Sequence, residues 1–300
     1  MRVAVTGAAG LLGQKVVETA VARGFTVFGF DVVGSTGIAE RPIEALDITS
    51  APDVMEQIGL CAPDWIVNTA AYTAVDESED DSRRVHDVNV GGVENLLVAS
   101  SVHKSRLLVL STDYVFDGED GPYEEDDQRN PLGTYGVSKA AMEDAVRNDG
   151  GPHLIARTMV LFGAAPGVRR NFGLWVLQNL LEGETIRTVT DQMGNPTLAS
   201  DLAGMLIGMM LQGGSGTYHV AGSDRISRYQ FAVALALTFG LNENLIQPVS
   251  TDELGQSASR PLESGFTLSK LRADFGIEPL SLTASLESFR KEVELHGDGR

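Results

Sequence analysis

The chain has little of several features that mark other classes of protein. Its 300 residues include one cysteine, Cys61, so no intrachain disulfide can form. The five histidines are scattered without the short spacings that metal ligands share, and we expect no metal site. No apolar run approaches the roughly 18 residues of a membrane span, and the first residues lack the pattern of a signal peptide. We therefore expect a cytoplasmic protein that binds no membrane.

Positive charge is also scarce. The chain has 23 Lys and Arg against 41 Asp and Glu, which gives a net charge of −18. Proteins that bind nucleic acid need a basic face, so this balance argues against nucleic acid as a partner. Acidic residues are densest over 117–127, where a solvated loop is a simpler interpretation than a metal cluster.

What the chain does contain is an alternation of apolar strands and helices up to residue 163. The strands are continuously apolar, which is typical of a parallel sheet that helices cover on both faces. We predict an α/β fold with a Rossmann-type doubly wound parallel sheet. The predicted strands are 2–7, 25–31, 64–71, 106–112 and 153–163, and the predicted helices are 11–24, 51–62, 81–105 and 138–149.

The rhythm changes after Gly163. A loop, an amphipathic helix over 171–183 and a turn-rich stretch over 191–197 follow. We predict a first domain over 1–163 and a smaller C-terminal α+β lobe over 164–300. A return segment near 195–222 is expected to pack back on the first domain.

Three glycines separate the first predicted strand from the first helix. Gly7, Gly10 and Gly13 have the spacing GxxGxxG in "VTGAAGLLG". Glycines let the backbone turn tightly and let a pyrophosphate approach the N-terminus of the helix. A P-loop requires Gly-Lys-Ser/Thr, but Gln14 separates Gly13 from Lys15. We favour dinucleotide binding by residues 1–163 over a tight turn with no ligand.

The second strand ends in Asp31. A carboxylate there accepts hydrogen bonds from the ribose hydroxyls of adenosine and repels a 2′-phosphate, which favours NAD(H) over NADP(H). The alternative is an aspartate that only ends a strand. Asp47 and Ile48 follow the next short strand and are expected to border the adenine ring.

Hydroxyl-bearing residues end the strand over 106–112, in "LSTDYVFDG". Tyr135 and Lys139 then lie four residues apart at the start of a helix, so they share one face. A nearby ammonium lowers the pKa of a phenol, and such a tyrosine can give a proton to a carbonyl oxygen as a hydride reaches the carbon. We expect Thr112 to hold that oxygen, with Asp113 and Tyr114 facing the substrate.

With these motifs, the chain resembles the extended short-chain dehydrogenase/reductase superfamily, and within it the dTDP-4-dehydrorhamnose reductase family. The resemblance runs from "VTGAAGLLG" to "ASRPLESGFTLSKL" and is most specific in "STDYVFDG" and "DQMGNPT". It implies NAD(P)H-dependent reduction of the C4 ketone of a nucleotide-activated 6-deoxy sugar. Family members often carry a Trp that stacks on the sugar, and Val160 stands at the corresponding position.

The resemblance also implies roles for individual residues. Thr112 corresponds to the catalytic hydroxyl, Tyr135 to the general acid and Lys139 to the residue that holds the nicotinamide ribose. The cofactor is expected to contact Gly7, Gly10, Leu11, Leu12, Gly13, Asp31, Asp47, Ile48, Ala70, Ala71, Tyr72, Asn89, Tyr135 and Lys139. The substrate is expected to contact Asp113, Tyr114, Asn171, Gln192 and Arg260, with Arg260 at the diphosphate.

Two other functions remain open at this point. The first is a regulatory subunit that binds the cofactor without turnover, because the β subunit of methionine adenosyltransferase resembles the same family. The intact set Thr112, Tyr135 and Lys139 argues against this function. An epimerase or dehydratase is disfavoured because Tyr114, and not a second acid, follows Asp113. We expect NAD(H) or NADP(H) as cofactor, a nucleotide-sugar substrate and a homodimer.

Overall fold

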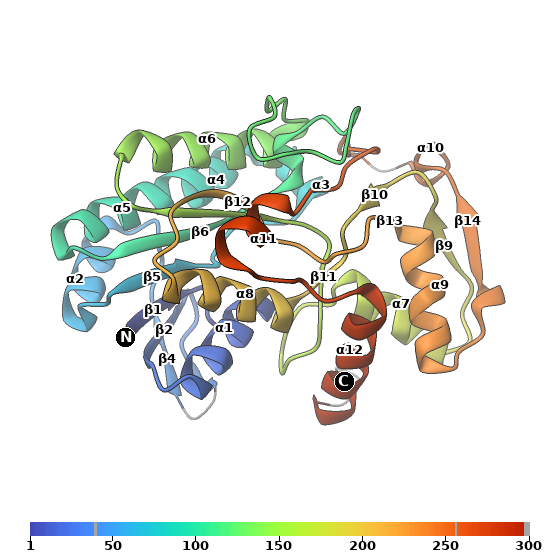
Figure 1. Cartoon of the computed structure of the whole chain (residues 1–300), viewed down its shortest axis with the longest axis horizontal. Coiled ribbons are helices and arrows are strands. Elements are labelled where there is room, and N and C mark those ends of the chain that lie inside the picture. The colour runs from blue at the N-terminus through green and yellow to red at the C-terminus, as the bar shows by residue number, and fades with distance from the viewer. Residues whose placement is uncertain (39–40, 256, 297–300) are drawn as a thin grey trace.

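An eight-stranded sheet forms the centre of the first domain (Figure 1). The computed structural model describes residues 1–38, 41–255 and 257–296. The strands of this sheet are β1 (Arg2–Thr6), β2 (Thr26–Asp31), β3 (Ser35–Ile38), β4 (Arg41–Ala45), β5 (Trp65–Asn68), β6 (Arg106–Thr112), β7 (Leu154–Thr158) and β12 (Gly216–His219). Their order is β12-β7-β6-β5-β1-β2-β4-β3, and only β3 runs antiparallel to its neighbour. This confirms the predicted doubly wound α/β fold.

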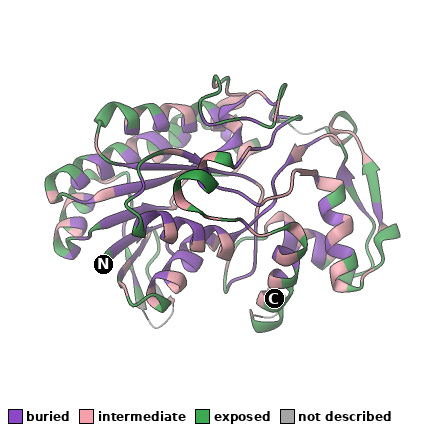
Figure 2. Cartoon of the chain, in the orientation of Figure 1, coloured by how far each residue is buried: buried purple, intermediate pink, exposed green. Residues whose placement is uncertain are grey.

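Helices cover both faces of the sheet. They are α1 (Leu11–Ala22), α2 (Ala51–Cys61), α3 (Val75–Ser78), α4 (Ser82–His86), α5 (Gly92–His103), α6 (Gly133–Asp149), α8 (Ala199–Leu211) and α11 (Ser269–Phe275). One apolar core joins the sheet to α1 and α8, and a second joins the opposite face to α2, α5 and α6. The strands between the two cores are almost entirely buried (Figure 2), which explains why their sequences are continuously apolar.

The remaining elements form the smaller lobe beside the sheet. Its helices are α7 (Phe172–Leu181), α9 (Arg228–Phe239), α10 (Thr251–Leu254) and α12 (Leu282–His296), and its strands are β8 (Leu161–Phe162), β9 (Ile186–Val189), β10 (Met193–Gly194), β11 (Thr197–Leu198), β13 (Ile226–Ser227) and β14 (Ile246–Val249). The strands pair two by two, β8 with β11, β9 with β14 and β10 with β13. A third apolar core lies between α7, α9 and α12.

Two segments of the C-terminal half belong to the sheet side of the molecule. In the expected return segment near 195–222, α8 packs on the sheet and β12 pairs with β7. In α11, Leu271 is buried in the same core, and the Tyr218 hydroxyl donates to Asp274 at 2.8 Å. No helix within the described ranges is both long and apolar enough to cross a bilayer.

Some predicted elements differ in detail. The long helix expected over 81–105 is interrupted by a π-helical turn over Asp87–Gly91. The helix expected from residue 138 begins at Gly133, which places Tyr135 in its first turn. The strand expected over 153–163 divides into β7 and β8, because Val160 between them has a φ of 47°. Such a conformation is costly for a β-branched residue.

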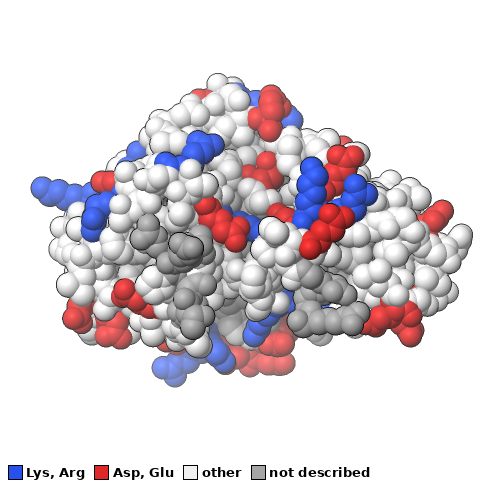
Figure 3. Space-filling model, turned by 90° about the horizontal axis from the view of Figure 1, so that it is seen from below, with Lys and Arg blue, Asp and Glu red and all other residues white. Residues whose placement is uncertain are grey.

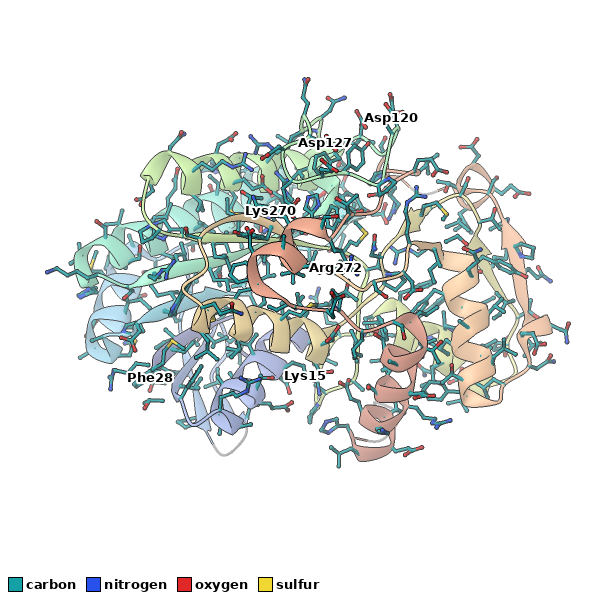
Figure 4. The ribbon with its side chains drawn as sticks, in the orientation of Figure 1. Lys15, Phe28, Asp120, Asp127, Lys270 and Arg272 are labelled. Atoms are coloured by element: carbon teal, nitrogen blue, oxygen red, sulfur yellow. The ribbon has the colours of Figure 1, made fainter. Side chains whose placement is uncertain are left out.

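The acidic stretch 117–127 is only partly solvated. Asp120 and Asp127 project from its outer edge (Figure 4). Glu125, in contrast, is 7% exposed, and its carboxylate accepts from the His219 amide at 2.9 Å. Asp117 accepts from the Tyr123 hydroxyl at 2.6 Å. Glu125 therefore fixes the loop to β12, and Asp117 holds the loop together internally.

Candidate active site

The glycine loop lies between β1 and α1 and leaves no space for side chains. A Cβ on Gly7, whose φ is 72°, would lie 2.5 Å from the Ala70 nitrogen, and a Cβ on Gly13 would lie 2.1 Å from the Gly7 oxygen. Gly10 is the N-cap residue of α1, and the helix has no side-chain cap and no acidic residue in its first turn. This uncovered helix N-terminus fits a pyrophosphate.

Other expected cofactor residues beside this loop have structural partners. The Asp31 carboxylate accepts from the Ala9 amide at 3.0 Å and so holds the loop itself. Asp47 accepts from the Thr49 amide at 2.9 Å. Leu12 and Ile48 are 7% and 4% exposed, so their side chains belong to the core, whereas Leu11 is half-buried.

A chain of contacts leads from the glycine loop to helix α6. The loop over 70–72 starts against Gly7, and the Asn89 side chain accepts from the Tyr72 amide at 2.8 Å. The side-chain amide of Asn89 donates to the backbone oxygen of Tyr72 at 3.1 Å and to Ser138 Oγ at 2.9 Å. Asn89 is 1% exposed and sits in the π-helical turn. It therefore positions the expected cofactor loop, including Ala71, against α6.

The end of β6 carries the expected catalytic hydroxyl. Thr112 Oγ1 donates to Asp113 Oδ1 at 3.1 Å, and Ser264 Oγ donates to Asp113 Oδ2 at 2.9 Å. The Tyr114 and Tyr135 rings meet edge to face with centroids 5.6 Å apart. The Thr112 hydroxyl lies close enough to Tyr135 to favour a lower pKa of its phenol. The structure thus brings together two residues that lie 23 positions apart in the sequence.

The pKa of Tyr135 is raised, first because the phenol is buried and then because Asp113 is close. Burial likewise raises the pKa of Asp113. Our expectation that Lys139 lowers the pKa of Tyr135 is wrong for the chain without a cofactor. A raised pKa keeps the proton on the phenol at neutral pH, which is the form that a proton donor needs.

Lys139 lies one helical turn after Tyr135 and is 4% exposed. Burial lowers the pKa of its ammonium to about 8, and the negative charge of Glu143, one turn further along α6, opposes this shift. An ammonium whose pKa is about 8 remains mostly protonated at physiological pH and can donate hydrogen bonds there.

Glu143 is the centre of a buried ionic cluster behind Lys139. Both of its carboxylate oxygens accept from the fully buried Arg157, at 2.8 and 2.9 Å. Arg129 and Arg147 approach the same carboxylate at 3.3 and 3.2 Å. Burial alone would raise the pKa of Glu143, but the hydrogen bonds and charge of Arg157 outweigh it, and the pKa is lowered.

The expected substrate residues lie where the smaller lobe meets the sheet domain. Arg260 forms a two-pronged ion pair with Asp76 of α3, with N–O distances of 3.1 and 2.7 Å. This arginine also donates to the backbone oxygen of Ala258 at 3.0 Å. Asn171 caps α7 by accepting from the Leu174 amide at 3.2 Å, and Gln192 donates to Thr251 Oγ1 at 3.0 Å. The last two therefore have structural roles in the lobe.

Comparison with known proteins gives the family. The family model described as "RmlD substrate binding domain" matches residues 1–295. The chain belongs to this family. It is similar to the dTDP-4-dehydrorhamnose reductase of Aggregatibacter actinomycetemcomitans, with 34% identity over 98% of this chain and 99% of the relative. It is also similar to a probable low-salt glycan biosynthesis reductase of Haloferax volcanii, with 33% identity over 94% and 95% of the two chains.

Solved structures agree with this assignment. The dTDP-4-dehydrorhamnose reductase of Bacillus anthracis, in complex with NADP, superposes with a TM-score of 0.88 and 32% identity, covering 97% of this chain and 99% of that one. The orthologue from Clostridium acetobutylicum has a TM-score of 0.89 and 28% identity, covering 98% and 100%. The expected membership of the dTDP-4-dehydrorhamnose reductase family is confirmed.

Several residues of this family member's site were not expected from the sequence. They are Asp76, Glu143, Arg157 and Ser264. The spacing of Glu143 from Lys139 was a visible signal, because positions four apart share a helix face. The others meet their partners only through the packing of distant segments, and nothing in the local sequence indicated them.

Proposed function

We propose that this protein uses NADH or NADPH to reduce the C4 ketone of a nucleotide-activated 6-deoxy sugar. The observation that carries this proposal is that Thr112 at the end of β6 lies close to Tyr135, which shares helix α6 with the buried Lys139. A contact chain through Asn89 ties this group to the glycine loop. The relatives named as dTDP-4-dehydrorhamnose reductases support the same reaction and suggest dTDP as the nucleotide.

Each residue has a defined part in this reaction. Tyr135 gives its proton to the ketone oxygen, and Thr112 turns its single hydroxyl proton from Asp113 to that oxygen and so orients it. Before substrate binds, Asp113 accepts hydrogen bonds from both Thr112 and Ser264. Lys139 would donate hydrogen bonds to the ribose of the cofactor.

The glycine loop and the loop over 70–72 would hold the cofactor, whose reduced nicotinamide supplies the hydride when bound. Asp31 at the end of β2 favours NADH, since its carboxylate would repel a 2′-phosphate. The Bacillus anthracis relative is in complex with NADP, so the preference has to be measured on this chain. We propose that residues 1–163 with the return segment 195–222 bind the cofactor and that the rest of 164–300 binds the substrate.

A spectrophotometric assay tests the proposal. Freshly prepared dTDP-4-dehydrorhamnose is mixed with the protein and either NADH or NADPH, and absorbance of the reduced cofactor is followed. We expect oxidation of both, with the larger kcat/KM for NADH. Binding of cofactor without oxidation on any 4-keto sugar would favour the regulatory-subunit alternative instead. The cytoplasmic location and the homodimer remain predictions.

A further inference from the structure

Helix α6 carries Tyr135 in its first turn, yet this helix has no cap of its own. Its N-cap residue is Leu132, whose side chain accepts no hydrogen bond, and no acidic residue stands in the first turn. The first amides of a helix lack partners within the helix and favour a negative charge nearby. The turn that holds the candidate proton donor therefore depends on partners from other elements.

Glu79, which directly follows α3, supplies that partner. Its Oε1 accepts from the Thr134 amide at 2.8 Å, and its Oε2 accepts from the Thr134 hydroxyl at 3.0 Å. The two residues lie 55 positions apart in the sequence. Hydrogen bonds to an ionised carboxylate are stronger than those between neutral groups. Both oxygens of Glu79 thus hold the residue that immediately precedes Tyr135.

Two glycines of this turn allow its neighbours to approach closely. Gly133 has a φ of 67°, and a Cβ there would lie 2.7 Å from Glu79 Oε1. A Cβ on Gly136 would overlap the backbone oxygen of Tyr114, in the short turn after β6. Tyr135 therefore stands between a glycine that leaves room for the Glu79 carboxylate and a glycine that packs on the end of β6.

The same short helix also holds the smaller lobe. Asp76 of α3 stands three residues before Glu79. Its carboxylate accepts from the Ala258 amide at 3.1 Å and pairs with Arg260 at 2.7 Å. Helix α3 with its last residues therefore joins the smaller lobe to the turn that carries Tyr135.

We infer that Glu79 is a positioning residue for the reduction: by holding the first turn of α6, it fixes the place from which Tyr135 gives its proton. This inference rests on the proposed function for the role of Tyr135. A proton donor must lie within hydrogen-bond reach of its acceptor, and a misplacement of about 1 Å can cost about 100-fold in rate. Glu79 is exposed and acts through the helix, not on the substrate.

Glu79→Ala removes both acceptors and tests the inference. We expect kcat with dTDP-4-dehydrorhamnose to fall at least about 10-fold while the Kd for NADH changes less than about twofold. Glu79→Gln keeps an acceptor oxygen for the Thr134 amide and is expected to restore kcat to within about threefold of wild type. Asp80→Ala removes the neighbouring exposed acid and, as the matched control, should leave kcat unchanged. The assays are run well below the lowest Tm among these variants.

A second comparison separates positioning from a role in folding alone. If Glu79 acts through Tyr135, adding Glu79→Ala to Tyr135→Phe changes the residual turnover less than about twofold, because the group that it positions is already gone. A cap that only stabilises the fold would lower Tm and leave kcat unchanged. Wild-type kcat in Glu79→Ala, or the same fold-loss in both backgrounds, would overturn the inference.

Fluorine NMR of the protein labelled with fluorotyrosine tests the position of Tyr135 without turnover. The Tyr135 resonance is the one missing from Tyr135→Phe. We expect Glu79→Ala to shift or broaden this resonance and Asp80→Ala to leave it in place. A resonance that Glu79→Ala leaves unchanged overturns the inference, whether or not the protein reduces a sugar. If the wild type reduces no 4-keto sugar while the resonance depends on Glu79, the proposed reaction is wrong and the positioning of Tyr135 stands.

Discussion

At the scale of single residues, burial sets the chemistry of the site. It raises the pKa of Tyr135, which keeps the phenol protonated at neutral pH, and it lowers the pKa of Lys139 to about 8 against the opposing charge of Glu143. Thr112 lies close to Tyr135 and donates to Asp113. The phenol is therefore a proton donor in a prepared position.

Tyr135→Phe removes that proton and leaves the ring. We expect kcat to fall at least about 100-fold, as is typical when a general acid is lost. The Kd for NADH is expected to change less than about twofold, because Asn89 and Ser138 still hold the cofactor loop. Stopped-flow turnover and fluorescence titration measure the two quantities, and turnover at the wild-type rate would remove Tyr135 from the mechanism.

Lys139→Met is expected to change stability and activity in opposite directions. The folded pKa of about 8 lies below the ordinary 10.5, so keeping this cation buried costs stability at pH 7. Between about pH 8 and 10.5 the unfolded chain binds this proton and the folded chain does not, and wild-type stability from this group rises with pH in that window. We expect the cofactor-free variant to have a Tm at or above wild type at pH 7, an advantage that shrinks above pH 8, and turnover reduced about 100-fold or more. A Tm several degrees below wild type would contradict this account.

At the scale of elements, the first β–α junction and helix α6 do most of the positioning. The junction depends on the absence of side chains, and α6 carries Tyr135, Lys139 and Glu143 at intervals of one turn along one face. The two elements meet through the π-helical turn that holds Asn89. A substitution in any of the three should therefore affect the cofactor site.

Gly13→Ala tests the junction. The added Cβ would lie 2.1 Å from the Gly7 oxygen, so the loop must move and NADH binding should be lost or weakened at least about 100-fold. Gly204→Ala in α8 is the matched control, since no atom lies within 4 Å of its Cβ position. This control is expected to bind NADH normally and to gain about 0.5–1 kcal/mol of stability, because alanine favours helix more than glycine does. Normal binding by Gly13→Ala would show that the loop is looser than described.

Glu143→Gln tests the ionic cluster behind Lys139. The negative charge of Glu143 raises the pKa of Lys139 against the effect of burial. In the wild type we expect kcat/KM for NADH to fall as pH rises through about 8, because the ammonium loses its proton. The variant should show this fall at lower pH, together with reduced stability from the unpaired Arg157.

The matched control for Glu143→Gln is Asp144→Asn. Asp144 is an exposed acid on the same helix as Glu143, and it pairs with Arg129. Its pH profile should coincide with that of the wild type. A profile of Glu143→Gln that also coincides with the wild type would show that Glu143 supports the fold without acting on Lys139.

At the scale of the whole molecule, the site is assembled where two lobes meet. Residues 257–264 of the smaller lobe reach the sheet domain: Asp76 accepts from Ser257, from the Ala258 amide and from Arg260. Ser264 reaches Asp113. On the face shown in Figure 3, acidic and basic side chains are interspersed among uncharged surface. The acidic net charge therefore does not preclude local groups of arginines.

Asp76→Ala tests the connection between the lobes. It removes the acceptor for the Ala258 amide, and we expect hydrogen exchange of residues 257–264 to accelerate at least about 10-fold while the central sheet keeps its protection. Asp80→Ala, in the same acidic run, is the control and should change nothing in that segment. Unchanged exchange in Asp76→Ala would show that other contacts hold the segment.

How much of the fold and of the candidate site could be predicted depends on how far apart in the sequence the interacting residues lie. The glycine loop, the end of β6 and the Tyr135–Lys139 pair are local patterns, and parallel strands bring their carboxyl ends to one edge of a sheet. Asn89 was expected to contact the cofactor, which stays a prediction, and the hydrogen bonds of its side chain to the 70–72 loop and to α6 were not expected. Arg260 was expected at the diphosphate, and its pairing with Asp76 was not. Such contacts join residues far apart in the sequence.

The sequence by itself determined the doubly wound sheet, the glycine turn and the placement of a hydroxyl, a phenol and an ammonium at its edge, because hydrophobic periodicity and helical spacing act over a few residues. Only the tertiary structure decided the direction of the Tyr135 pKa shift, the partners of Glu143 and the pairing of Arg260 with Asp76. Burial and charge pairing depend on which distant segments pack together, and no short-range pattern in the chain contains that information.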